Sequence, residues 1–195
     1  MFELPPMPTW DSLHPLIIHF PIVLLLLTPF LVLISATLPP RRSGPYLMAA
    51  MIILLFGTAS LFLAAATGEA AGELAERGGG VDKVLAAHQD LAGETRMIFL
   101  GLSAILIGIL FLPRLLHRPQ TRIFSTMLPL AFLALYSVGI LFLVNTAHQG
   151  GRLVHEFGIH AILPEEASQQ TPPDVAGQGT MDENNTEKYA GDALQ

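Results

Sequence analysis

The stretch that decides the fold is residues 14–38, HPLIIHFPIVLLLLTPFLVLISATL, an almost unbroken nonpolar run. A helix needs about 20 such residues to cross the hydrocarbon core of a bilayer. The first run spans about 16–38, and three comparable runs follow at about 46–67, 91–112 and 123–146. Since 51% of the residues are hydrophobic and only 13% are charged, the chain is predicted to be an integral membrane protein with four spans.

The connections between these spans predict an all-α, up-down four-helix bundle. The linker PPRRSGP (39–45) separates spans 1 and 2, whereas GEAAGELAER (68–77) continues span 2 as helix. The glycines at 78–80 are expected to form a turn, and VDKVLAAHQD (81–90) leads into span 3 as helix. Spans 2 and 3 therefore predict an extended extracytoplasmic helical hairpin. Span 4 continues into HQGGRLVHEFGIHAI (148–162), which is expected to dock against that hairpin.

Prolines inside the spans predict local bends. Pro29 lacks the N–H group that would bond to the carbonyl of Leu25, and Pro129 leaves the carbonyl of Ser125 free in the same way. Each freed carbonyl needs another donor or a distorted turn.

Arginines predict the orientation. The connections after spans 1 and 3 contain no acidic residue, and they hold Arg41, Arg42, Arg114, Arg118 and Arg122. By the positive-inside rule these connections are cytoplasmic and both termini are extracytoplasmic. In a bacterium this predicts a multi-pass protein of the inner (cytoplasmic) membrane with both termini in the periplasm.

The chain divides into a lead at residues 1–13, a transmembrane domain at 14–162 and an acidic tail at 163–195. The tail holds seven acidic residues and one lysine, which accounts for the whole net charge of −6. Its polar composition predicts disorder. The chain has no cysteine, which excludes disulfides, thiolate metal sites, iron–sulfur clusters and covalently attached heme.

Histidines gather at the extracytoplasmic end of the spans. Five of the seven lie there, and they are His14, His19, His88, His148 and His155. Counting about 22 residues from each cytoplasmic end, at 1.5 Å per residue, puts His14, Glu69, His88 and His148 at similar depth. His14 and His19 are five residues apart, or about 140° around a helix, so they are expected to serve different partners. His19 lies deepest and is therefore the one expected to be most committed to a partner.

This layer predicts a b-type heme protein that transfers electrons. Histidine is costly in lipid and is the commonest metal ligand among side chains. The candidate heme-binding residues are His14, His19, His88 and His148, with His19 and either His88 or His148 as axial ligands. Small residues near Gly68, Gly93, Gly150 and Gly151 are expected to let the porphyrin approach the backbone. The expected partners are the lipid bilayer, a periplasmic cytochrome or quinol, and other membrane subunits.

Two alternatives stay open. In the first, His19, His88, His148 and Glu69 bind Zn²⁺, Cu²⁺ or Fe²⁺ without heme. In the second, the histidines form a hydrogen-bonded polar layer in an accessory subunit of a respiratory-type complex. The chain shows no phosphate-binding loop and no basic nucleic-acid surface, and the residues do not decide whether it is an enzyme.

The motifs HPLIIHFPI (14–22), HQDLAG (88–93) and HQGGRLVHEFG (148–158) together resemble a family of bacterial four-span membrane proteins known as domain of unknown function 2231 (DUF2231). The resemblance covers roughly residues 12–160, and its pattern includes His14, His19, His88 and His148. It implies the fold and topology given above. Members occur fused to, or beside, cytochrome c-like and other respiratory modules, which implies a redox role.

Overall fold

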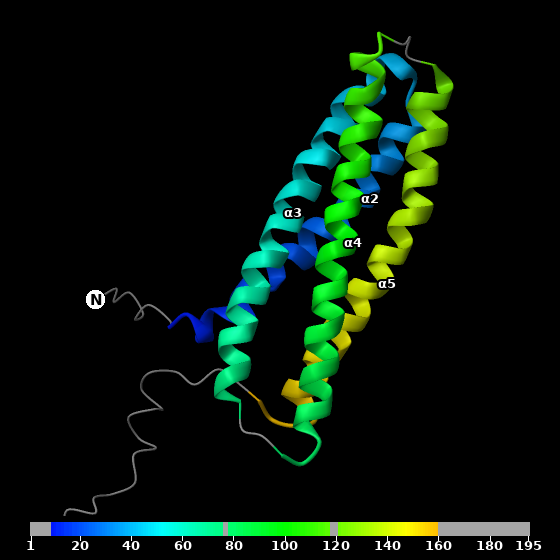
Figure 1. Ribbon diagram of the computed structural model, residues 1–195. Helices are drawn as coiled ribbons and strands as arrows, with labels where there is room; N and C mark the ends of the chain where they lie inside the picture. Colours follow the sequence, from blue (N-terminus) through cyan, green and yellow to red (C-terminus); the bar gives the residue numbers. More distant parts are fainter. Residues whose placement is uncertain (1–8, 76–77, 118–120, 160–195) are drawn as a thin grey trace, which may run out of the picture. The chain divides into compact units, whose positions relative to one another are not determined.

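The computed structural model describes residues 9–75, 78–117 and 121–159 (Figure 1). This part of the chain is helical and contains four helices that are long and apolar enough to cross a membrane. They are His14–Thr37, Pro40–Glu73, Val81–Leu115 and Ile123–His155. The prediction of a multi-pass all-α membrane protein is thereby confirmed. The acidic tail at 163–195 and most of the lead at 1–13 lie outside the described residues.

The secondary structure follows the predicted spans with two differences. Its elements are the 3₁₀ turn η1 (Asp11–Leu13), α1 (His14–Ile17), α2 (His19–Thr37), α3 (Pro40–Leu74), α4 (Val81–Leu115), the π-helical turn η2 (Ile123–Met127) and α5 (Leu128–His155). The predicted linker at 39–45 is wrong, because α3 already begins at Pro40, where a missing N–H costs nothing. Span 4 begins with the π-helical turn η2, which ends two residues before Pro129. Pro129 has no N–H group to donate to the carbonyl of Ser125.

The turn between α3 and α4 was predicted correctly. Gly78, Gly79 and Gly80 have φ angles of 122°, 58° and 98°, which side chains other than glycine rarely adopt. Val81 then starts α4, with its N–H bonded to the carbonyl of Gly78.

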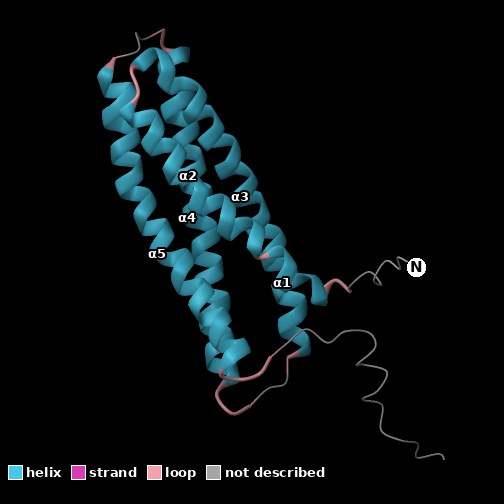
Figure 2. Cartoon of the chain, turned by 180° about the vertical axis from the view of Figure 1, so that it is seen from behind, coloured by secondary structure: helices cyan, strands magenta, loops and turns pink. Residues whose placement is uncertain are grey.

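The helices form a ring in which each packs against the next along the chain, and α2 packs against α5 to close it. The first turn, α1, packs against α3. The start of α1, the turn between α3 and α4 and the end of α5 lie at one end of the bundle (Figures 1 and 2). We call it the histidine end, since His14, His88 and His148 lie there. The opposite end carries the described arginines of the predicted connections, which are Arg41, Arg42, Arg114 and Arg122.

The core consists of two separate apolar clusters. The main cluster runs through the spans and includes Leu25, Leu54, Phe99, Leu106 and Tyr136. The smaller one lies at the histidine end, where Val81, Val84 and Leu85 of α4 pack with Leu153 of α5, and with Phe157 and Ile159 beyond it. The end of span 4 therefore docks against α4, as predicted.

The carbonyl freed by Pro29 has a donor on another helix. The hydroxyl of Tyr136 lies 2.8 Å from the carbonyl oxygen of Leu25 and donates a hydrogen bond to it. Tyr136 is 1% exposed and also contacts the ring of Phe99 edge-on. The predicted weak point of α2 is thus stabilised by α5.

Candidate functional site

His14 lies on the face of the N-terminal segment that points into the bundle. Residues 14, 18, 21 and 25 follow the 3-4 spacing of one helical face, and Pro21 and Leu25 are buried. The ring covers the backbone of α3 at Gly68, where an added Cβ would lie 2.8 Å from Cε1 of His14. A glycine at position 68 is therefore needed for this contact.

The hydrogen bond of His14 defines its tautomer. Its Nδ1 lies 3.1 Å from Oγ1 of Thr67, a fully buried residue of α3. The Thr67 hydroxyl donates its one proton to the carbonyls of Leu63 and Ala64 in its own helix, at 3.2 and 3.0 Å. Its oxygen must then accept from Nδ1–H of His14, which leaves the lone pair of the neutral imidazole on Nε2.

His88 repeats this arrangement between α4 and α5. Its Nδ1 lies 2.9 Å from the carbonyl oxygen of Thr146. Because a carbonyl can only accept, Nδ1 of His88 carries the proton and Nε2 has the lone pair. A Cβ on Gly150 would lie 3.0 Å from Cε1 of His88, so here too the ring covers a glycine.

A hydroxyl pair beside His88 joins the same two helices. Oγ1 of Thr146 donates to the carbonyl of Phe142 and lies 2.8 Å from Oγ1 of Thr95, so Thr95 is the donor in this pair. Thr95 is fully buried. Sequence reasoning missed Thr67, Thr95 and Thr146, although Thr67 and Thr146 lie within one turn of the predicted depth of the histidines and Thr95 lies about two turns along α4 from His88. Hydroxyls at that depth were the available signal.

His14 and His88 are the two candidate ligands whose rings are held between helices by hydrogen bonds. Both are half-buried, and neither Nε2 has a hydrogen-bond partner among the described residues. Every fully buried side-chain nitrogen or oxygen in this part of the chain has a partner. Both Nε2 atoms are therefore accessible at the surface of the site.

His19 is placed differently from the prediction. Its Nδ1 donates a 2.7 Å hydrogen bond to the carbonyl of Pro15, one turn back in the chain, and its side chain is exposed. His19 does have the expected partner, but that partner lies in its own segment. The angle of about 140° between His14 and His19 explains this, because only one of the two can face inward.

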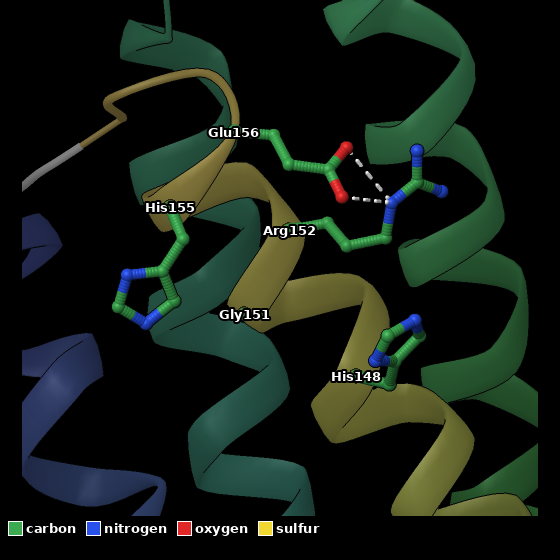
Figure 3. Close-up of a pocket in the computed structure, with 5 residues that line it drawn as sticks. All are labelled: His148, Gly151, Arg152, His155 and Glu156. Atoms are coloured by element: carbon green, nitrogen blue, oxygen red, sulfur yellow. Dashed lines mark hydrogen bonds and ion pairs between the residues drawn. The ribbon is translucent and has the colours of Figure 1, made fainter.

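His148 is exposed on the surface of α5. It lines a pocket together with Gly151, Arg152, His155 and Glu156 (Figure 3). Nε of Arg152 donates to both carboxylate oxygens of Glu156, at 2.9 and 3.0 Å. This hydrogen bond holds the pKa of Glu156 below its ordinary value.

The predicted metal-site residues are spread over several surfaces. Glu69 has an exposed carboxylate, 3.9 Å from Nη1 of Arg96, whose guanidinium also lies over the ring of Phe62. Within the described ranges, no three His, Asp or Glu side chains are grouped closely enough to hold a metal ion. Of the four predicted residues, His88 is half-buried, and His19, His148 and Glu69 are exposed.

Of the four glycines expected to face a cofactor, three have a side chain near the Cβ position and one has open space there. Gly68 and Gly150 are covered by the two imidazoles, and Gly93 has Nη2 of Arg96 at 3.9 Å from its Cβ position. A Cβ on Gly151 would meet no heavy atom within 4 Å.

The sequence of this chain matches the model of one protein family. The match covers residues 11–162, and the family is described as "Predicted membrane protein (DUF2231)". The chain belongs to this DUF2231 family. The DUF2231 match contains the whole described bundle, including both histidine–threonine–glycine contacts. Comparisons with curated proteins and with solved structures found no match.

Proposed function

We propose that this DUF2231 protein binds heme b noncovalently at the histidine end and transfers electrons. The observation that supports this best is the shared tautomer of His14, His19 and His88. Each donates Nδ1–H to a protein oxygen and keeps the lone pair on Nε2. Histidines that ligate metals are held in this way, because the second hydrogen bond sets the tautomer and the orientation of the ring.

His14 and His88 are the residues that would hold the heme iron. They are half-buried on two helix pairs, α1 on α3 and α4 on α5, and each is held by a hydrogen bond to the other helix of its pair. Neutral imidazoles with accessible Nε2 atoms are the donor set that heme iron takes in helical bundles. Bound there, heme would supply a one-electron redox couple. His19 and His148 are exposed and are less favoured as ligands.

The surrounding residues hold the ligands in place. Thr67 and the carbonyl of Thr146 fix the two rings, while Gly68 and Gly150 let the rings approach the helix backbones. Thr95 holds α4 and α5 together beside His88. These contacts reduce the reorganisation that ligand binding would require.

We further propose that the histidine end is extracytoplasmic, with both termini in the periplasm. The arginine-rich connections at the other end support this orientation. The surplus length of α3 and α4 then forms the extracytoplasmic hairpin. Such a placement suits electron exchange with a periplasmic cytochrome or a quinol.

The same contacts favour a second candidate, that of a structural accessory subunit. His14 joins α1 to α3 and His88 joins α4 to α5. Both histidines could therefore hold helices together through interhelical hydrogen bonds without binding any cofactor. Buried side-chain hydrogen bonds between membrane helices are commonly structural.

An absorption spectrum of detergent-purified protein, expressed with ample heme and recorded oxidised and dithionite-reduced, separates these candidates. The heme proposal requires a Soret band and α and β bands that sharpen on reduction. His14→Ala and His88→Ala should each lose these bands, whereas His117→Ala, an exposed position at the other end, should keep them. A colourless protein with stoichiometric metal supports a non-heme site. A colourless protein without metal supports the structural candidate.

A further inference from the structure

The end of the bundle opposite the histidines carries positive charge without any acidic residue. Its described arginines, all of them exposed, are Arg41, Arg42, Arg114 and Arg122. We call these four residues the arginine end. The chain has no Asp or Glu from residue 12 to 68 or from 95 to 155, so every acidic residue that the structure describes lies towards the histidine end. The bundle therefore supplies no acidic partner for these four guanidinium groups within its described part.

The four arginines come from elements that pack together. Arg41 and Arg42 lie in the first turn of α3, Arg114 lies in the last turn of α4, and Arg122 directly precedes η2. Helix α3 packs against α4, and η2 packs against α2 and α3. Nη2 of Arg114 lies 3.9 Å from the Cβ position of Gly44 on α3. The charge at the end of α4 is thus brought beside the start of α3.

The side chain of Arg114 is held at this place by its own helix. Its Nη1 donates to the carbonyl of Leu110, one turn earlier, and the centre of its guanidinium lies 5.8 Å from the centroid of the ring of Phe111. Its remaining N–H groups have no hydrogen-bond partner among the described residues. A guanidinium fixed in this way, with donors left over, is suited to binding an oxyanion.

Helix length places the arginine end at the level of lipid headgroups. Counting about 20 residues back from Arg114 reaches Glu94, which is about 30 Å along α4 and matches the thickness of the hydrocarbon core. Between them, residues 95–113 include one charged side chain, Arg96, close to the Glu94 side. Arg114 and Glu94 are therefore spaced to lie at the two surfaces of the membrane.

We infer that the arginine end binds the headgroups of anionic phospholipids, at the surface between the start of α3 and the end of α4. The net negative charge of such a lipid offsets the positive charge that no acidic residue of the described bundle compensates. Leu115 and Leu116, which follow Arg114, are exposed and can contact the acyl chains of the same lipid. A soluble anion would gain nothing from these leucines. The inference is independent of the proposed heme.

Native mass spectrometry of the full-length protein, purified in detergent and titrated with phosphatidylglycerol, measures this binding. The wild type should bind phosphatidylglycerol about tenfold more tightly than phosphatidylcholine, which has a phosphate but no net charge. Arg114→Gln should weaken the binding of phosphatidylglycerol about fivefold, and the double variant Arg41→Gln, Arg42→Gln about 25-fold. Each arginine near an anionic membrane surface contributes about a factor of five in affinity.

Two control variants separate local charge from other effects. Arg114→Lys keeps the positive charge and should bind phosphatidylglycerol nearly as tightly as the wild type does. Lys83→Gln removes one positive charge from an exposed position on α4 at the histidine end, and it should leave the affinity unchanged. If the glutamine variants fail to fold, as judged by circular dichroism and gel filtration, the wild type decides the matter, since its binding should weaken as ionic strength rises.

Four results would overturn the inference. They are equal binding of the two lipids, unchanged affinity in folded arginine variants, an equal loss of affinity in Lys83→Gln, and binding that does not depend on ionic strength. Inorganic phosphate that displaces the lipid at equal concentration would also overturn it, because the site would then take a soluble anion. A protein that binds phosphatidylglycerol as expected but shows no heme spectrum refutes the heme proposal alone.

Discussion

The hydroxyl of Tyr136 donates a 2.8 Å hydrogen bond to the carbonyl oxygen of Leu25, whose partner within α2 is removed by Pro29. Both residues belong to the main apolar cluster, where an unsatisfied carbonyl is costly. Two helices that are far apart in sequence are thus joined at the point where one of them is interrupted.

Replacing this tyrosine tests the bond. Tyr136→Phe should lower the free energy of unfolding by about 1–3 kcal/mol, because the carbonyl of Leu25 loses its donor. In a Pro29→Ala background, where residue 29 regains its N–H, the same change should cost less. A double-mutant cycle, measured by unfolding in mixed micelles, gives the difference. Equal costs in the two backgrounds would show that the hydroxyl does not replace the missing backbone bond.

The adjacent glycines of α5 should respond in opposite ways to the same substitution. Gly150→Ala places a methyl group 3.0 Å from Cε1 of His88 and should destabilise the protein by about 1 kcal/mol or more. Gly151→Ala meets open space and should stabilise the helix by up to about 1 kcal/mol. Thermal unfolding of the two variants in one detergent compares them directly. Equal shifts of the same sign would argue against the ring of His88 lying on Gly150.

Thr67 should matter for the proposed ligand role of His14 beyond its contribution to packing. Thr67→Val preserves the shape but removes the oxygen that accepts from Nδ1–H, and should reduce heme affinity about 10- to 100-fold. Thr67→Ser keeps the hydroxyl and should restore most of the affinity. Heme titration of the apoprotein measures both. A serine variant as weak as the valine variant would indicate that the methyl group, not the hydroxyl, is needed.

The ion pair between Arg152 and Glu156 predicts a pH effect. Arg152 lowers the pKa of Glu156 below its ordinary value of 4.5, so the pair stabilises the folded state above that value. This contribution should be lost as the pH falls through the lowered pKa. Arg152→Gln should raise the pKa of Glu156 towards 4.5, as measured by NMR titration of isotope-labelled glutamate. An unchanged pKa would mean that the carboxylate is not held by the guanidinium in solution.

Much of the bundle could be predicted from the sequence, because membrane spans, glycine turns and proline interruptions depend on local composition. The freed carbonyl of Leu25 was predictable in this way, but its donor, Tyr136, was not. Finding that donor requires knowing that α2 packs against α5, and helix order around a bundle is not encoded in span length.

In the candidate site, too, some features could be predicted from local sequence and others depended on contacts between helices. The common depth of His14 and His88 followed from counting residues, and the angle between His14 and His19 followed from helix geometry. Which of these two histidines faces inward depended on the buried stripe through Pro21 and Leu25. The role of Gly150 depended on a ring from another helix. Local sequence could not supply either relationship.

The smaller apolar cluster is separate from the main one, so we expect the bundle to open as two cooperative units. His88 lies between Leu85 in that cluster and Phe99 in the main core, so the outer turns of α4 and α5 are connected to the spans through polar contacts. Such an outer unit should open on its own in amide hydrogen exchange, at lower free energy than the spans. A ligand bound by His88 would tie the two units together. Slower exchange across Val81–Leu85 would then report occupancy of the site, even for a ligand that has no colour.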